Sequence, residues 1–218
     1  MLGVDDSIGK IIETLEALDQ LEETIIIYYS DNGYMMGEHG LIDKRVMYEE
    51  SIRVPAFVHW PERTGRPSIN ASFILNIDLG PTILDMAGLS SPSSMQGRSF
   101  LPLVLGEQTS WREDFVYEYF VDPQAAQTPT IFGLRTKAYS YMTYHGVWDL
   151  FELYDMQQDP AQLNNLVGGI KYGHAYGTFL RHVGRQDPAM HEGVQALDDR
   201  LTELLQEYGG SRHPTWLR

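Results

Sequence analysis

The sequence predicts an α/β protein, with a sheet-and-helix domain followed by a small antiparallel sheet and a closing helix. Three observations predict this class. An amphipathic helical pattern near the start of the chain is followed directly by a continuous β-branched run. Four short, aromatic-rich runs follow residue 106, and a second amphipathic pattern comes after them. We therefore expect two domains, residues 1–106 and residues 107–218.

The first domain is expected to begin with a helix and a buried strand. Residues 4–20 carry apolar side chains at helical spacing behind polar N-cap residues. Residues 24–29 form a continuous β-branched and aromatic run, which is typical of a strand buried on both faces. Residues 54–60 predict a second strand, with Pro55 at its start or at a sheet edge.

A second helix is expected after these strands. Asp78 is expected to cap its N-terminus, Pro81 to lie in its first turn and Gly88 to stop it just after residue 87. Residues 99–105 predict one or two further helical turns.

The second domain is expected to be an antiparallel sheet with a closing helix. The predicted strands are residues 114–119, 131–136, 139–145 and 150–154. Residues 168–186 have an irregular pattern. The closing helix is marked by Met190, Val194, Leu197, Leu201, Leu204 and Leu205, and ends at Gly209 and Gly210.

Charge and composition exclude several classes of function. Sixteen Lys and Arg against 30 Asp and Glu give a net charge of −14, so a nucleic-acid partner is not expected. The absence of cysteine excludes disulfides, thiolate zinc sites and cysteine nucleophiles within this chain. No apolar run approaches the roughly 20 residues that span a bilayer. The first residues show no signal-peptide core.

A polar, glycine-punctuated loop over residues 30–53 is too long and too ionisable to be only a connection. Asp31 and Asn32 stand at the carboxyl end of the first strand, where open α/β sheets bind ligands. Their carboxylate and amide oxygens suit Ca²⁺ or Mg²⁺. Asp-Asn-Gly is also a common turn sequence, so a turn and a metal site both stay open here.

The same loop also carries Glu38, His39 and Lys44. A carboxylate, an amide, an imidazole and an ammonium group on one loop can together hold a metal ion and bind the oxygens of a transferring sulfuryl or phosphoryl group. The alternative is a solvated charged loop in which His39 is hydrogen-bonded locally.

The string SDNGYMMGEHGLIDKRVMYEESIRVP, residues 30–55, resembles the corresponding stretch of the formylglycine-dependent sulfatases of the alkaline phosphatase superfamily. The similarity continues through NIDLGPTILDMAGL at residues 76–89 and MQGRSFLPLVLG at residues 95–106. Residues 133–166 resemble the C-terminal subdomain of the family, with Ser140 where a lysine is common. The resemblance implies the C-terminal part of an alkaline-phosphatase-like domain.

This resemblance implies roles for four residues of the loop. Asp31 and Asn32 match two metal ligands of the family, whose divalent cation is usually calcium. Lys44 matches the lysine that contacts the sulfate, and His39 is a candidate substrate contact. Tyr48 and Arg53 are expected to fold the loop, since an arginine beside glutamates is usually paired.

The chain departs from the family in its nucleophile. Sulfatases attack the ester with the hydrate of formylglycine, which is made from the first residue of a C/S-x-P-x-R motif, and no such motif occurs in the 218 residues. The nearest string, SSPSS at residues 90–94, ends in serine where arginine is required, and is expected to be a plain turn. We expect a truncated sulfatase that is inactive alone.

The function expected from the resemblance is hydrolysis of sulfate esters, with a sulfated glycan or a small sulfate ester as the substrate. One alternative is a phosphonate or phosphate monoester hydrolase of the same superfamily. Another is a non-catalytic half-domain that pairs through its open sheet edge with a missing N-terminal half or with a copy of itself. Members of the family are often periplasmic or secreted, and the compartment of this chain stays open.

Overall fold

The structure is a computed structural model that describes residues 2–107, 109–122, 128–145, 150–168, 179–181, 183 and 187–210. Its contacts divide the chain into two compact units. Unit 1 combines Met1–Asp31 with Val54–Trp111, and unit 2 combines Asn32–Arg53 with Arg112–Arg218. The polar loop thus lies almost wholly in unit 2, although in chain order it interrupts unit 1. The expected division between residues 106 and 107 stays a prediction.

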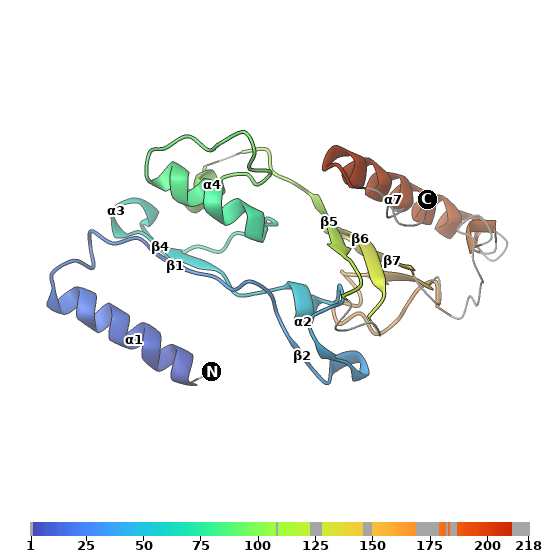
Figure 1. Cartoon of the computed structure of the whole chain (residues 1–218), viewed down its shortest axis with the longest axis horizontal. Helices are drawn as coiled ribbons and strands as arrows, with labels where there is room; N and C mark the ends of the chain where they lie inside the picture. The colour runs from blue at the N-terminus through green and yellow to red at the C-terminus, as the bar shows by residue number, and fades with distance from the viewer. Residues whose placement is uncertain are drawn as a thin grey trace. The chain divides into compact units, whose positions relative to one another are not determined.

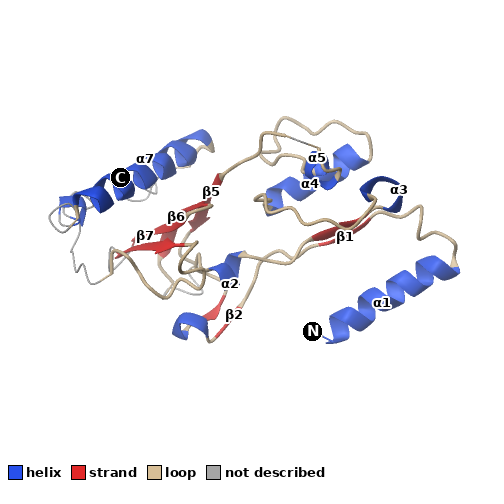
Figure 2. Cartoon of the chain, turned by 180° about the vertical axis from the view of Figure 1, so that it is seen from behind, coloured by secondary structure: helices blue, strands red, loops and turns tan. Residues whose placement is uncertain are grey.

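The described residues of unit 1 form a two-stranded antiparallel ladder and four helices. The strands are β1 (Ile26–Tyr28) and β4 (Phe57–His59), with Ile27 opposite Val58. Figures 1 and 2 show α1 and α4 on opposite sides of this ladder. The helices are α1 (Leu2–Ala17), α3 (Pro61–Thr64), α4 (Asn76–Met86) and α5 (Leu101–Val104). The expected first helix, second helix and short helical turns are therefore confirmed.

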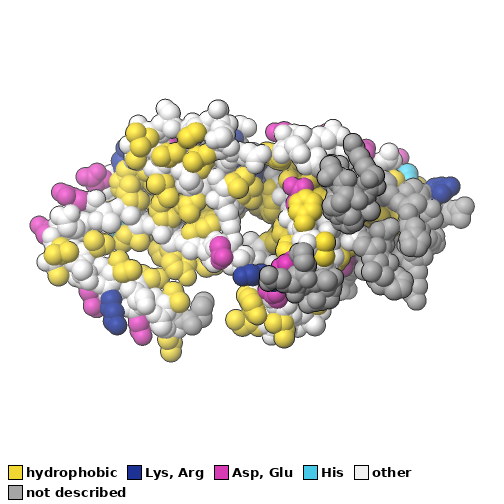
Figure 3. Space-filling model, in the orientation of Figure 1, with side chains coloured by type: hydrophobic (Ala, Val, Ile, Leu, Met, Phe, Trp, Pro, Cys, Tyr) yellow, Lys and Arg dark blue, Asp and Glu magenta, His cyan; other side chains and the backbone are white. Residues whose placement is uncertain are grey.

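The expectation that residues 24–29 form a strand buried on both faces is wrong in two respects. The strand β1 has only three residues, and all of them are half-buried. Among the described residues, β4 is its one hydrogen-bonded neighbour, so little covers its other edge. Helix α1 likewise buries none of its side chains, and Leu2 and Leu18 are largely exposed. Figure 3 shows apolar side chains spread over the surface of this unit.

The structure also corrects the expected start of helix α4. Asp78 is not the N-cap but the third helical residue, because its buried carboxylate reaches back to accept the Leu75 N–H at 2.7 Å. The same carboxylate accepts the Arg98 N–H at 2.8 Å, a contact that no local pattern reveals. Pro81 consequently lies in the second turn. Gly88, with φ 71°, ends the helix as expected.

Unit 2 contains the expected four-stranded antiparallel sheet and closing helix. The strands pair in the order of the chain: β5 (Asp114–Tyr119), β6 (Thr130–Thr136), β7 (Tyr139–His145) and β8 (Leu150–Asp155). Helix α7 (Pro188–Glu207) begins at Asp187, whose carboxylate accepts the Ala189 N–H at 3.0 Å. Residues 168–186, expected to be irregular, lie mostly outside the described residues. No described helix is both long and apolar enough to cross a bilayer.

The two faces of this sheet pack against different parts of the chain. Alternate side chains on one face, including Phe132, Tyr141 and Leu153, form a buried cluster with the apolar stripe of α7. Side chains on the other face form a second cluster with the polar loop of residues 32–53. Its buried members are Met35, Met47, Tyr48, Ile131, Met142, Tyr144, Tyr154 and Met156. The loop is therefore part of the core of unit 2.

Gly133 permits this packing, because a Cβ at this position would overlap the sulfur of buried Met47. We expect Gly133→Ala to lower the free energy of unfolding by about 1–3 kcal/mol, since the fully buried Met47 side chain must move and the Tyr141 carbonyl oxygen would lie only 3.1 Å from the added Cβ. The matched control is Gly193→Ala in α7, where a Cβ meets no atom within 4 Å. The control should be stabilising by up to about 1 kcal/mol. Urea unfolding measures both, and equal effects would contradict the packing argument.

Candidate functional site

The polar loop folds into a short hairpin followed by one turn of helix. The hairpin pairs β2 (Met35–Met36) with β3 (Ile42–Asp43), and the 3₁₀ turn η1 (Glu38–Gly40) lies at its tip. Helix α2 (Glu49–Ile52) follows. Figure 2 shows the hairpin extending from α2. Of the residues expected to carry chemistry, His39 thus lies at the tip of the hairpin and Lys44 directly follows its second strand.

Ser51 fastens two parts of this loop to helix α2. Its carbonyl oxygen accepts the Gly33 N–H at 2.8 Å, and its hydroxyl donates to the Lys44 carbonyl oxygen at 2.7 Å. Ser51 itself is buried. The backbone beside Asn32 and the backbone of Lys44 are therefore held by one residue.

Gly33 is needed for a close approach of two backbones and not for a turn. Residues 32–34 form no turn, and Gly33 is not among the residues with positive φ. A Cβ at Gly33 would overlap the carbonyl oxygen of Glu50 in α2. The close approach to Glu50 therefore explains Gly33, while the choice between a turn and a metal site at Asp-Asn-Gly stays open.

A largely buried polar network attaches helix α2 to the sheet. The Arg135 Nε donates to Glu49 Oε1 at 2.9 Å, with both side chains mostly buried. The Glu49 N–H donates to Gln162 Oε1 at 2.8 Å, and the Gln162 amide donates to the Ser140 hydroxyl at 3.1 Å. Arg53 lies 3.7 Å from Glu49, as expected for a residue that folds the loop. Each buried polar group here has a partner, so the attachment is specific.

His39 stacks on Tyr48 at the tip of the hairpin, with ring centroids 3.9 Å apart and planes inclined by 7°. Its Nε2 lies 3.5 Å from Glu50 Oε2. The Tyr48 hydroxyl donates to Glu152 Oε2 at 2.9 Å, and the Tyr154 hydroxyl donates to the same oxygen at 3.0 Å. Burial, followed by the charge of Glu152, raises the pKa of Tyr48 to about 12.

The four residues expected to form the site are distributed over both units. Asn32, His39 and Lys44 belong to unit 2, whereas Asp31 is the last residue of its segment in unit 1. In unit 1, the Asn76 side chain donates to the Asp31 carbonyl oxygen. Lys44 and Asp31 are exposed. Among the described residues, no three His, Cys, Asp or Glu side chains are grouped closely enough to hold a metal ion.

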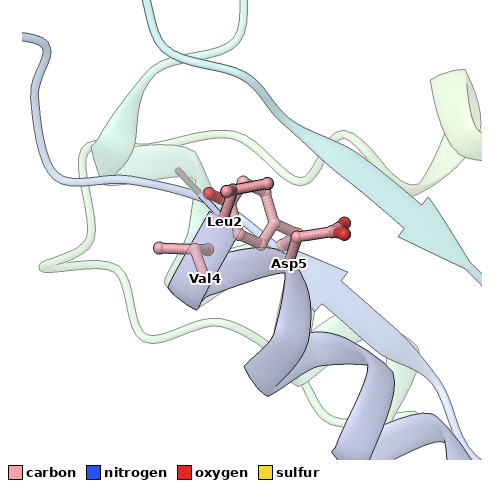
Figure 4. Close-up of a pocket in the computed structure, with 4 residues that line it drawn as sticks. Leu2, Val4 and Asp5 are labelled. Atoms are coloured by element: carbon pink, nitrogen blue, oxygen red, sulfur yellow. The ribbon is translucent and has the colours of Figure 1, made fainter.

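A pocket of about 290 Å³ lies elsewhere, in unit 1, and is lined by Leu2, Val4, Asp5 and Tyr28. Figure 4 shows Leu2, Val4 and Asp5 from the first turn of α1 around it. Asp5 is its one ionisable group apart from the phenol of Tyr28. This pocket contains none of the expected site residues.

Three residues important to the loop were not found from the sequence. They are Ser51, Gln162 and Glu50. Ser51 and Gln162 form hydrogen bonds with residues elsewhere in the chain, and Glu50 contacts the imidazole ring of His39. Gln162 is 113 positions from its partner Glu49. Neither spacing nor periodicity in the sequence signals such contacts.

Residues 37–198 match the family described as N-sulphoglucosamine sulphohydrolase, C-terminal. The chain is 37% identical over 175 residues to an N-acetylglucosamine-6-O-sulfatase of Bacteroides thetaiotaomicron, covering 79% of this chain and 31% of that protein. A structure solved in complex with its substrate, D-glucosamine-2-N,6-O-disulfate, is similar with a TM-score of 0.75 and 30% identity. That likeness covers 93% of this chain and 39% of the other.

The phosphonate monoester hydrolase of Agrobacterium radiobacter is also similar, with a TM-score of 0.68 and 24% identity, over 86% of this chain and 39% of that one. This likeness concerns the fold alone. The chain spans about a third of the length of the curated relatives it matches.

Removing the Ser51 hydroxyl tests whether it fixes the backbone of Lys44. We expect Ser51→Ala to lower the free energy of unfolding by about 1–3 kcal/mol, because the Lys44 carbonyl oxygen loses its donor beside a buried side chain. Amide hydrogen exchange around Lys44 should accelerate. Ser7→Ala is the matched control, since Ser7 makes the same kind of bond to a carbonyl on an exposed helix. Equal effects of the two variants would contradict the role of Ser51.

Alkaline pH should weaken unit 2. The pKa of Tyr48 in the folded chain, about 12, lies above its ordinary value near 10. Between these values the unfolded chain loses a proton that the folded chain keeps, so stability is full below pH 10 and is lost as pH rises toward 12. Urea unfolding at increasing pH measures the loss, which should be shallower in Tyr48→Phe. Identical pH slopes would contradict this assignment.

Proposed function

The chain belongs to the sulfatase family, and from that premise we propose that it forms the cation- and ester-binding part of a sulfuric ester hydrolase. The observation that carries the proposal is the anchoring of the loop: Ser51, a buried residue of helix α2, holds the backbone beside Asn32 and the backbone of Lys44 to that helix. Such pre-organisation is what a binding site for a small anion needs.

Asp31 and Asn32 are proposed to hold a divalent cation, Ca²⁺ or Mg²⁺. The donor set fits, because carboxylate and amide oxygens are the hard ligands that these ions prefer. The Asn32 amide nitrogen donates to the Gly33 carbonyl oxygen at 2.7 Å, so the ligand offered by Asn32 is its amide oxygen. Gly33 keeps this segment close against α2. When bound, the cation polarises the sulfuryl oxygens.

Lys44 and His39 are proposed to contact the ester. The Lys44 side chain is exposed, while its backbone is held through the carbonyl oxygen. The ammonium group can therefore reach a bound anion from a fixed backbone position. The net charge of −14 repels anions, so a sulfate ester needs such local positive charge together with the cation. In the family the nucleophile is formylglycine, whose motif is not in these 218 residues. We therefore propose that the chain alone binds the ester without hydrolysing it.

The proposed substrate is a sulfated carbohydrate. Support comes from relatives named N-acetylglucosamine-6-sulfatases and from the similar structure solved with a glucosamine disulfate. A second candidate is a phosphonate or phosphate monoester, which is supported by 30% identity to a multifunctional alkaline phosphatase superfamily protein of Trinickia caryophylli.

The alternative of a non-catalytic half-domain that pairs with another polypeptide also has an observation in its favour. Helix α1 buries none of its side chains, and β1 has one paired edge among the described residues. Pairing would cover this apolar surface and is compatible with the binding role proposed for the loop.

Titration calorimetry of the purified chain tests the binding roles. We expect Ca²⁺ binding that is weakened at least about tenfold by Asn32→Ala, because an oxygen ligand is lost. With Ca²⁺ present, N-acetylglucosamine 6-sulfate should bind, and Lys44→Ala should weaken it by about tenfold or more without changing the affinity for Ca²⁺.

Lys137→Ala is the control, since Lys137 is an exposed lysine of the same unit and pairs with Glu113 at 3.5 Å. A wild-type chain that binds neither ion nor ester would contradict the proposal. Hydrolysis of an aryl sulfate by the chain alone would contradict the proposal that the chain binds the ester without hydrolysing it. Tighter binding of a phosphonate monoester than of the sulfate would favour the second candidate substrate.

A further inference from the structure

The backbone of His39 is held in an unusual conformation. Its φ of 55° and ψ of 16° are left-handed, which is uncommon for a residue with a side chain. Gly37 and Gly40, with φ of 128° and 70°, flank it. Such a conformation persists only where the surroundings impose it. The backbone conformation at the tip of the hairpin therefore depends on the side-chain contacts of His39.

Tyr48 supplies the first of these contacts. The two rings are parallel and in van der Waals contact, and only 10% of the His39 side chain is exposed. Tyr48 cannot easily turn away, because it is buried in the core and its hydroxyl is bonded to Glu152. Tyr154 shares the same carboxylate oxygen and lies edge-on to the Tyr48 ring. The His39 ring therefore stacks on the Tyr48 ring, which is itself held in place by burial and by the hydrogen bond of its hydroxyl group.

Glu50 supplies the second contact. Its Oε2 is buried and has no hydrogen-bond partner among the described residues, and the His39 Nε2 lies 3.5 Å away. A buried carboxylate oxygen is costly unless a donor or a positive charge is near it. A proton on Nε2 meets this need, which selects one orientation of the imidazole and leaves Nδ1 as the nitrogen not directed at Glu50.

The neighbouring glutamates of α2 thus have separate tasks. Glu49 attaches the helix to the sheet through Arg135 and Gln162. Glu50 makes neither of these contacts and faces His39 instead. Attachment of the helix does not require a carboxylate at Glu50, so its position beside the imidazole calls for a different explanation.

We propose that Tyr48 and Glu50 are positioning residues that hold the His39 imidazole with Nε2 toward Glu50, so that Nδ1 is the nitrogen presented to the sulfate ester. This inference rests on the proposed function, in which His39 contacts the ester. Tyr48 fixes the plane of the ring, and Glu50 fixes which edge of the ring carries the proton. His39 is thereby prepared before an ester arrives.

Long-range proton–nitrogen NMR of the chain labelled at histidine tests this arrangement, with the His39 signals assigned by their loss in His39→Gln. We expect the neutral imidazole to carry its proton on Nε2. In Glu50→Gln this preference should weaken, since a neutral amide attracts the Nε2 proton less strongly than a carboxylate does. The ionisable groups next to His39 are Glu50, Tyr48 and Glu38, the last an exposed neighbour along the chain.

Glu38→Gln is the matched control, because it removes a neighbouring carboxylate that accepts the Met36 N–H, and it should leave the preferred tautomer unchanged. For Tyr48, the pair is Tyr48→Phe, which keeps the stacked ring and should keep the His39 spectrum, and Tyr48→Leu, which should abolish the ring-current shift and mix the tautomers. If Tyr48→Leu does not fold, the Glu50→Gln and Glu38→Gln pair decides the result.

An Nδ1-protonated neutral imidazole in the wild type, or an unchanged tautomer preference in a folded Glu50→Gln variant, would overturn the proposal. Millimolar N-acetylglucosamine 6-sulfate with Ca²⁺ is then added to the wild type. A shift at Nδ1 supports the whole inference. If the ester shifts Lys44 but not His39, the presentation to the ester is overturned. If it shifts neither while the tautomer is as expected, the proposed ester binding fails and the positioning of the ring stands.

Discussion

The packing of one loop against one face of a sheet is the interaction on which the candidate site depends. The side chains of Met35, Met47 and Tyr48 are buried against strands β6, β7 and β8, on the sheet face opposite helix α7. Burial of each such side chain contributes roughly 1.5–3 kcal/mol. Without this apolar contact a glycine-rich, charged segment of this length would have little to order it. The ordering of the polar residues follows from the burial of their apolar neighbours.

Polar contacts then give the ordered loop a single arrangement. Hydrophobic packing is not directional, so it places helix α2 on the sheet without fixing its rotation. The ion pair of Glu49 with Arg135 and the bonds of Gln162 fix that rotation. Ser51 in turn fixes the backbones of Gly33 and Lys44 relative to helix α2, and Glu50 of the same helix contacts His39. The buried sheet thereby fixes the backbone positions from which the candidate site residues extend.

The sequence predicted those parts of the fold that depend on local patterns. The strands of unit 2 and helix α7 have clear periodicity, and their bounds were close to those observed. The capping of α4 was missed because Asp78 also serves Arg98, 20 positions away. The role of Gly33 was missed because the backbone it approaches is that of Glu50. The four site residues were singled out by their chemistry on the loop, and their roles came from the resemblance and stay predictions. Their supports, Ser51 and Gln162, have no local signal.

The most direct test of the central claim is paramagnetic broadening of the amide NMR signals of the chain by Mn²⁺, a cation with the ligand preference of Mg²⁺. The proposed cation and ester site predicts that trace Mn²⁺ broadens the signals of Asp31, Asn32, His39 and Lys44 together, and that excess Ca²⁺ restores them. Broadening that is confined to other acidic parts of the chain, with these four signals unaffected, would contradict the account.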